Sequence, residues 1–223
     1  MAKLTLNCPN CGAPVEFSWA SSVQATCTYC NSILVRTDVD VKKVGEVADL
    51  PNDSSPIQIG TEGIYKNLAF IVAGRIIYEY ENGGWNEWHI VYNDGTSGWL
   101  SDAQLEYVVS SEFKATEKLP NAFSVHPGNE FRWGGQWFVV TSVTKAHYKG
   151  VEGQLPFQFW DADACTFADL RNTEGRFATI DYSDGDNSPV VYVGDAVKFT
   201  DLKLKNLREF EGWPPLAEMK LSS

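Results

Sequence analysis

A single polar hairpin occurs twice in this 223-residue chain, about ninety positions apart. Residues 88–100 run from one apolar segment through a polar turn to another, and residues 177–192 repeat the pattern. The matching positions are Ile90, Tyr92, Asp94 and Gly95 in the first copy and Ile180, Tyr182, Asp184 and Gly185 in the second. Alternating apolar residues on both sides of an Asp-Gly turn are typical of a β-hairpin. The repeat therefore predicts a body built from two related β units.

Other stretches also predict strands. Residues 68–81 form a long apolar run rich in β-branched side chains, and Asn82-Gly83-Gly84 provides a turn before residues 85–92. Residues 130–143 form another strand pair around Gly134-Gly135. Aromatic residues make up 13% of the chain, which suits half-buried sheets. We expect an all-β fold, with two related antiparallel β-barrel or sandwich modules in tandem.

A metal-binding motif precedes these modules. It contains two Cys-x-x-Cys pairs, which are Cys8, Cys11, Cys27 and Cys30. This spacing is typical of a zinc ribbon, in which each pair presents both sulfurs to one metal ion. Gly12 and Asn31 follow the pairs and tolerate the left-handed backbone of such a turn. Four thiolates leave no position open for water, so the predicted Zn²⁺ is structural.

Two other interpretations of the cysteines are weaker. Disulfides are disfavoured because the N-terminus lacks the apolar run of a signal peptide, and cytosolic thiols stay reduced. A redox pair needs only one Cys-x-x-Cys, and no βαβ pattern follows it. A zinc site remains the preferred interpretation of the four cysteines.

The predicted organisation combines these features. It has a zinc ribbon over residues 1–37, a linker over 38–56, a first β module over 57–114, a linker over 115–128, a second β module over 129–212 and a tail over 213–223. Both linkers are rich in polar residues or proline.

The acidic composition restricts the partners. The formal net charge is −11, and the 18 lysines and arginines form no run. Such a surface repels nucleic acid and anionic lipid, so we expect neither as a partner. No segment has the eighteen or more apolar residues of a spanning helix. We expect a cytoplasmic protein without direct membrane insertion.

Candidate catalytic side chains are few. Cys165 lies among Asp161, Asp163 and Asp169, which disfavour a thiolate, so we interpret it as a small buried apolar residue. The three histidines, His89, His126 and His147, are too dispersed for a metal triad. His89 alternates with apolar residues, which predicts a half-exposed position in a sheet.

The acidic turn near residues 181–187 permits two further hypotheses. Calcium is one, but the spacing lacks a bidentate glutamate, and turn chemistry alone explains Asp-Gly. A general acid and base formed by Glu152 and Asp181 is the other.

Tryptophans are better candidates for binding. Trp85 and Trp88 are an odd number of positions apart, so they point to opposite faces of a strand and one is expected at an exposed or seam position.

The second module resembles a bacterial family, domain of unknown function 4178. The resemblance rests on Val151-Glu-Gly-Gln-Leu-Pro156, Ala168-Asp-Leu170, Gly175-Arg-Phe-Ala-Thr-Ile-Asp-Tyr182 and Val191-Tyr-Val-Gly194, with Gly74, Trp85-Asn-Glu-Trp88 and Gly98-Trp-Leu100 in the first module. Gln154 stands where the family pattern leads us to expect an acid. The resemblance implies a cytosolic accessory protein connected with membrane or envelope upkeep, often with a cysteine-pair ribbon in front. It implies no reaction and no catalytic residue.

These observations lead to one functional prediction and one alternative. We expect a non-catalytic zinc-ribbon adaptor that binds a protein partner through the ribbon or an exposed aromatic patch. The alternative is a hydrolase-like or transferase-like enzyme that uses Glu152 and Asp181. A concave pocket that holds both carboxylates would favour the enzyme.

Overall fold

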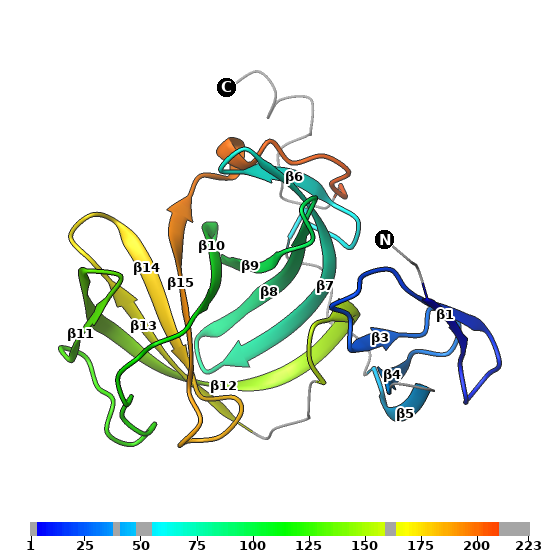
Figure 1. The fold of residues 1–223 in the computed structure, drawn as a ribbon, viewed down its shortest axis with the longest axis horizontal. Coiled ribbons are helices and arrows are strands. Elements are labelled where there is room, and N and C mark those ends of the chain that lie inside the picture. The colour runs from blue at the N-terminus through cyan, green and yellow to red at the C-terminus, as the bar shows by residue number, and fades with distance from the viewer. Residues whose placement is uncertain (1–3, 38–40, 48–54, 159–163, 210–223) are drawn as a thin grey trace.

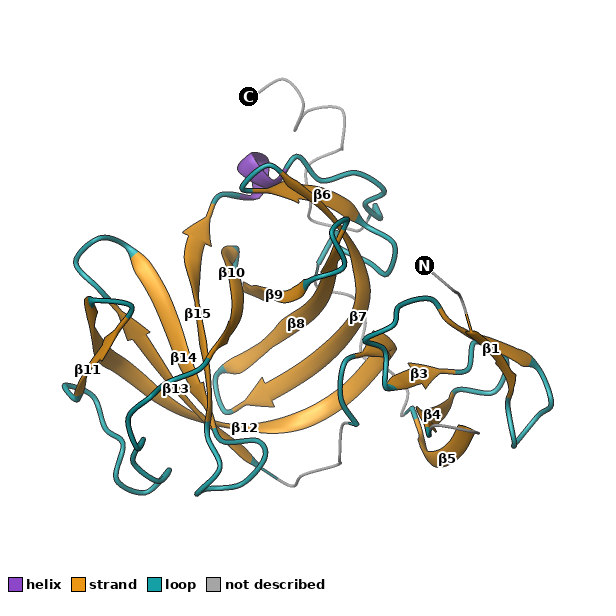
Figure 2. Cartoon of the chain, viewed as in Figure 1, coloured by secondary structure: helices purple, strands orange, loops and turns teal. Residues whose placement is uncertain are grey.

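The computed structural model describes residues 4–37, 41–47, 55–158 and 164–209 (Figure 1). Regular structure in these residues is almost entirely β-strand, with one short 3-10 helix, η1 (Phe199–Leu202) (Figure 2). This confirms the predicted all-β class. None of the helical structure in the described residues has the length and apolar character needed to cross a membrane.

The N-terminal cysteines lie in a small group of strands beside the main body (Figure 1). These strands are β1 (Leu4–Asn7), β2 (Pro14–Phe17), β3 (Gln24–Thr26), β4 (Ser32–Arg36) and β5 (Val41–Glu46). We call this group the ribbon. Strands β1 and β2 form a separate antiparallel pair, whereas β3, β4 and β5 continue the large sheet through a β3–β12 pairing.

The body contains the remaining strands. They are β6 (Glu62–Tyr65), β7 (Leu68–Tyr80), β8 (Gly83–Tyr92), β9 (Ser97–Ala103), β10 (Glu106–Phe113), β11 (Glu130–Trp133), β12 (Gln136–Leu155), β13 (Cys165–Arg171), β14 (Arg176–Asp181) and β15 (Val190–Val197). Both predicted hairpins are present, as β8–β9 and β14–β15, and Gly95 and Gly185 take the positive φ angles of 90° and 118° at their turns. The predicted turns at Asn82-Gly83-Gly84 and Gly134-Gly135 also join paired strands.

The body strands form a closed ring of pairings. The ring runs β7, β8, β9, β10, β15, β14, β13 and β12, and then returns to β7. Strand β12 closes it, since residues 139–146 pair with β13 while residues 147–153 pair with β7. The β10–β15 and β12–β7 pairings join the two halves of the chain into one sheet, so the two hairpin units share one sheet.

Both faces of the ring strands are covered. One set of side chains on β7–β10, with Trp88 and Ile90 at its centre, packs against Ile57 and Leu202 to form a first outer core. The equivalent set on β12–β15 packs against Val125 and Trp133 to form a second outer core. Successive side chains on a strand point to opposite faces, so the alternate residues of both halves face each other inside the ring.

The predicted domain boundaries remain predictions. Strand β5 lies inside the stretch 38–56 that we interpreted as a linker, and it pairs with β4 along the ribbon. The predicted tail, residues 213–223, lies outside the described residues.

Candidate metal site and interior cavity

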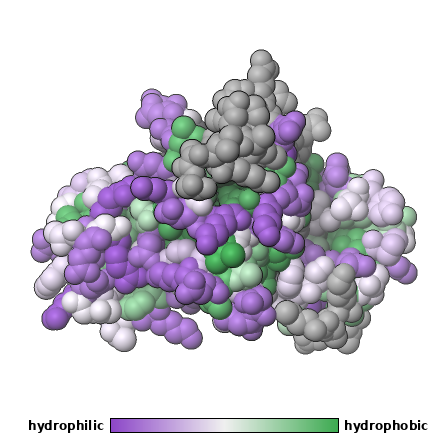
Figure 3. Space-filling view, turned by 90° about the horizontal axis from the view of Figure 1, so that it is seen from above, coloured by the Kyte–Doolittle hydropathy of each residue, from purple (hydrophilic) through white to green (hydrophobic). Residues whose placement is uncertain are grey.

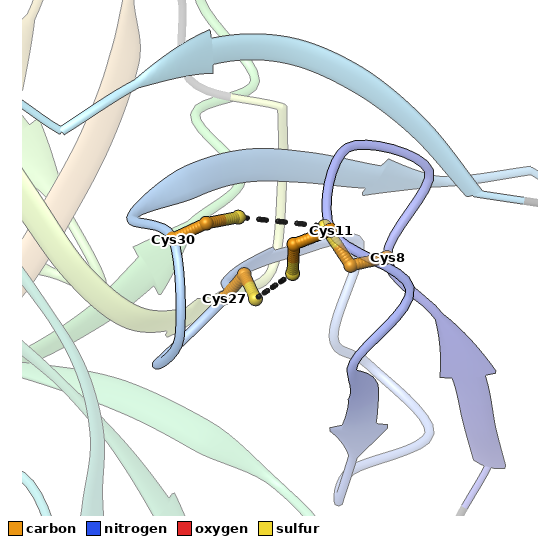
Figure 4. Close-up of side chains that lie close together, drawn as sticks. All are labelled: Cys8, Cys11, Cys27 and Cys30. Carbon is orange, nitrogen blue, oxygen red and sulfur yellow. Dashed lines mark hydrogen bonds between the residues drawn. The ribbon is translucent and has the colours of Figure 1, made fainter.

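Two equivalent turns bring the cysteine pairs together. In the first, the backbone N–H of Gly12 donates to the carbonyl of Cys8, and in the second Asn31 donates to Cys27, at 2.8 and 2.9 Å. Gly12 and Asn31 have φ angles of 77° and 55°, so the predicted left-handed positions are confirmed. Short strands on both sides hold the turns, as Figure 4 shows.

The four sulfurs have the spacing of one metal site. The Sγ atoms of Cys8 and Cys30 are 3.7 Å apart, and those of Cys11 and Cys27 are 3.8 Å apart (Figure 4). All four sulfurs lie within 4.8 Å of one another. A tetrahedral ion with metal–sulfur bonds of about 2.3 Å requires sulfurs about 3.8 Å apart, whereas a disulfide requires about 2.05 Å. The residues therefore fit a four-thiolate metal site.

The surroundings of this cluster are those of a structural site. Cys8 and Cys27 are buried, with Phe17 and Leu34 among their apolar neighbours, while Cys11 is exposed at the edge. Four protein sulfurs occupy every position of a tetrahedral ion, so no position remains for a substrate or a water. The arrangement can stabilise the ribbon but offers no catalytic position.

Gln154 fastens the ribbon to the body. Its Oε1 accepts hydrogen bonds from the backbone N–H of Ser18 at 3.0 Å and the hydroxyl of Ser22 at 2.8 Å. Its Nε2 donates to the carbonyl of Glu16 at 3.1 Å. Gln154 also lies opposite Ala25 in the antiparallel pairing of β12 with β3. The ribbon therefore joins the body through the pairing of β3 with β12 and through the hydrogen bonds of the Gln154 side chain.

A second candidate site lies inside the ring. A cavity is lined from both halves of the body, by β7–β10 on one side and β13–β15 on the other. Its walls are mainly aromatic, and its polar groups include the carboxylates of Glu87 and Asp181. Glu87 accepts hydrogen bonds from Trp85 Nε1 at 3.0 Å and Ser101 Oγ at 2.7 Å. Asp181 Oδ1 accepts one from the backbone N–H of Ser183 at 2.8 Å.

Burial shifts the pKa of both cavity carboxyls. Loss of solvent raises the pKa of Glu87 to about 8, although the donors Ser101 and Trp85 act in the opposite direction. Burial likewise raises the pKa of Asp181 to about 6, against the hydrogen bond from Ser183. Both shifts follow from the cost of a charge in a poorly hydrated cavity. Glu87 was not among the candidates from the sequence, where the only signal was an acid in an apolar strand between two tryptophans.

The two carboxylates of the enzyme hypothesis lie in different environments. Asp181 lines the cavity, but Glu152 is not among the residues that line it. Glu152 instead pairs with the buried Arg75, whose Nη1 lies 3.0 Å from its Oε2. Arg75 also donates twice to Asn86 and packs over the ring of Trp88. The two carboxylates therefore do not both line this cavity, and the enzymatic alternative stays a prediction.

The other candidate residues have structural positions. Cys165 is buried, and burial followed by the charges of Asp181 and Asp184 raises the pKa of its thiol to about 11. Asp161 and Asp163 lie outside the described residues. The prediction for His89 was wrong, because this side chain is fully buried. Both faces of β8 are covered, so alternation with apolar residues does not mark a solvent-facing position there.

His89 contacts the backbone of β12 and a residue that lines the cavity. Its Nδ1 lies 3.0 Å from the carbonyl oxygen of Gln154, and its ring lies 5.3 Å from that of Trp99, a cavity residue. Burial lowers the pKa of His89 to about 4, against the Gln154 hydrogen bond, so the imidazole is neutral at pH 7. His126 and His147 are exposed on other elements, so the three histidines do not meet.

Trp85 and Trp88 point to opposite faces of β8, as predicted. Trp88 is buried in the first outer core, while Trp85 is half-buried and stacks on Tyr78 with a centroid distance of 5.0 Å. Among the described tryptophans, Trp137 has a large exposed fraction, 59%. In the calcium hypothesis, Asp184 and Asp186 remain exposed turn residues.

The fold and the cysteine cluster define an all-β protein with a zinc-ribbon-like site beside a ring of strands. The chain belongs to the family described as Domain of unknown function (DUF4178), whose profile matches residues 58–199. This match begins just before β6 and ends after β15, so it contains every strand of the ring and leaves the ribbon outside. No curated protein and no solved structure matched the chain.

Proposed function

We propose that this protein is a non-catalytic cytoplasmic adaptor, in which a zinc-stabilised ribbon and the β body together form a docking groove for a protein partner. Zinc is the metal that best suits four thiolates in a tetrahedral arrangement. A reducing compartment keeps such thiolates available as ligands. A connection with membrane or envelope upkeep rests on the family resemblance alone.

The observation that carries the proposal is the groove between ribbon and body. It is lined by Trp19 of the ribbon and by residues of β6, β7 and β8, including Ile64, Phe70 and Tyr92. Its volume is about 490 Å³, and its surface is mostly apolar. Ile64 is 40% exposed, so the apolar wall is open to solvent. Figure 3 shows apolar side chains among hydrophilic ones on the face seen from above.

The charges at the groove indicate the kind of partner. Lys203 and Lys205 line it and are exposed, and neither forms an ion pair with a described residue. They are notable in a chain with a net charge of −11. An extended partner segment with apolar anchors and an acidic flank would satisfy both the wall and the lysines. The Gln154 contacts keep Trp19 and the body in register, which pre-forms the groove.

Site-specific photo-crosslinking in the native host tests this groove. A benzoylphenylalanine in place of Ile64 should capture one protein, and the double variant Lys203→Glu, Lys205→Glu should reduce that product about tenfold. Phe123, which is 81% exposed and is not among the groove residues, is the matched control position. Equal capture at both positions, or capture insensitive to the lysines, would reject the groove as the docking site.

Mass spectrometry of the intact protein tests the metal separately. Under non-denaturing conditions, we expect one zinc ion per chain, and its loss in the variant Cys27→Ser. A protein that carries no metal when purified with reduced thiols would contradict the zinc assignment without affecting the crosslinking result.

A further inference from the structure

The cavity inside the ring combines aromatic walls with acidic groups. Tyr78, Trp99, Phe167, Phe177 and Tyr192 contribute rings from five different strands. The cavity has a volume of about 50 Å³. By the same measure one water needs about 10–15 Å³, so the space suits a ligand of about four or five heavy atoms.

The acids of this cavity have no positive neighbour in the part of its lining that the structure describes. The described residues that line it include no lysine, arginine or histidine. Glu87 receives hydrogen bonds only from the neutral donors of Trp85 and Ser101, and Asp181 only from Ser183, within the residues the structure describes. Ionising a poorly hydrated carboxyl without a cationic partner is costly, so a cationic ligand in the cavity would offset that cost and bind the ionised carboxyls.

The walls also favour a cation. An aromatic ring presents a negative face, and a cation over such a face is stabilised most where water is excluded. Tyr78 and Phe167 contact each other with centroids 5.0 Å apart, and Trp99 contacts Phe157 at 5.8 Å. Phe157 lines the cavity and is 37% exposed, so it lies where the cavity meets solvent. The rings thus continue from the entrance to the carboxylates.

The positions of the carboxylates argue against a metal ion. In the described residues, the cysteine cluster is the group of potential ligand atoms that lie close enough together for one ion. Glu87 and Asp181 belong to no such group, although both line the same cavity. A compact divalent ion needs several converging oxygens at about 2–2.6 Å. An organic cation is larger, can extend between separated acids and gains from the rings.

We propose that this cavity binds a small organic cation, an alkylammonium group whose charge lies near Glu87 and Asp181 and whose alkyl part packs on Trp99 and Tyr78. This ligand site is separate from the docking groove, whose lining residues it does not share. With this site, the β body would bind a small ligand independently of the docking groove.

Calorimetric titration of the full-length zinc-loaded protein with butylammonium chloride tests the site, with 1-butanol as the neutral control. We expect saturable binding of butylammonium and at least tenfold weaker binding of 1-butanol. The indole N–H resonance of Trp85 should shift with the same saturation curve, because this group donates to Glu87. No saturable binding, or equal binding of the two probes, would overturn the proposal.

Charge-neutralising variants locate the bound cation. Glu87→Gln keeps an acceptor oxygen for Trp85 Nε1, and its amide N–H can donate to the hydroxyl of Ser101, which accepts as well as donates. We expect this variant and Asp181→Asn to weaken butylammonium binding at least tenfold each. Glu81→Gln, an exposed residue in the turn after β7, makes the same change in net charge and should have no effect. Equal weakening by Glu81→Gln would show non-specific attraction and reject the cavity. The two-probe comparison decides the matter if a cavity variant does not fold.

Free amines and lysine side chains both carry an alkylammonium group. A parallel titration with Nα-acetyl-lysine methylamide distinguishes them. Tighter binding of butylammonium assigns the site to a free amine, and tighter binding of the blocked lysine assigns it to a protein side chain; both results support the alkylammonium site.

Discussion

The Oε1 atom of Gln154 lies 2.8 Å from the hydroxyl of Ser22, so a side chain of β12 holds the ribbon that carries the cysteine cluster directly. The same amide donates to the carbonyl of Glu16, and the backbone carbonyl of Gln154 contacts the Nδ1 of His89. One residue therefore connects the ribbon, the strand that closes the ring and the buried His89 of β8. An amide suits this position because it both donates and accepts.

Replacement of this amide by an acid tests the connection. Gln154→Glu keeps an acceptor for Ser22 but cannot donate to the carbonyl of Glu16, which then faces a carboxylate. Loss of such a bond in a part-buried site costs about 1–3 kcal/mol of unfolding free energy. Hydrogen exchange should increase in residues 16–25, and urea denaturation should report the loss. Gln104→Glu, at an exposed turn, is the control and should change stability by less than about 0.5 kcal/mol.

Metal removal should separate the ribbon from the body. The ribbon core consists of the cysteines and a few apolar residues, and its strand pairing to β12 covers two residue pairs. We expect a chelator to abolish exchange protection in residues 4–46 while protection in β7–β10 and β13–β15 persists, since the ring has its own cores. Concurrent loss of protection throughout the chain would show instead that ribbon and ring fold as one unit.

The local parts of this structure could be predicted from the sequence, whereas the closure of the ring could not. Asp94-Gly95 encodes its own turn, and Cys8 with Cys11 carries a metal-ligand spacing, so both required only neighbouring residues. The β12–β7 pairing joins Glu152 to Arg75, and no local pattern selects such a partner. For the same reason the burial of both faces of β8 was missed, and with it the burial of His89 and the position of Glu87 in a cavity.

Glu87 should make stability depend on pH. Its pKa is about 8 in the folded protein and ordinarily 4.5, so its contribution is present in acid and is lost as pH rises through 8. His89 acts in the opposite direction, but only below its ordinary pKa of 6.5. Between pH 6.5 and 8.5 the wild type should therefore lose about 1–2 kcal/mol relative to Glu87→Gln. The check is the free energy of unfolding in urea, measured for both proteins across this pH range. The same pH dependence in the wild type and in Glu87→Gln would contradict the raised pKa.

Gly74 provides the sharpest test of ring closure. A Cβ at this position would lie 2.1 Å from the carbonyl oxygen of Gln154, which is backbone of the paired strand β12. Gly74→Ala can be accommodated only if β7 and β12 separate, so it should cost more than about 3 kcal/mol. Gly95→Ala is the control, because its Cβ meets nothing within 4 Å and only its φ of 90° is unfavourable. That change should cost about 1 kcal/mol. Equal midpoints for the two variants in urea would mean that β7 and β12 are not in this close contact in solution.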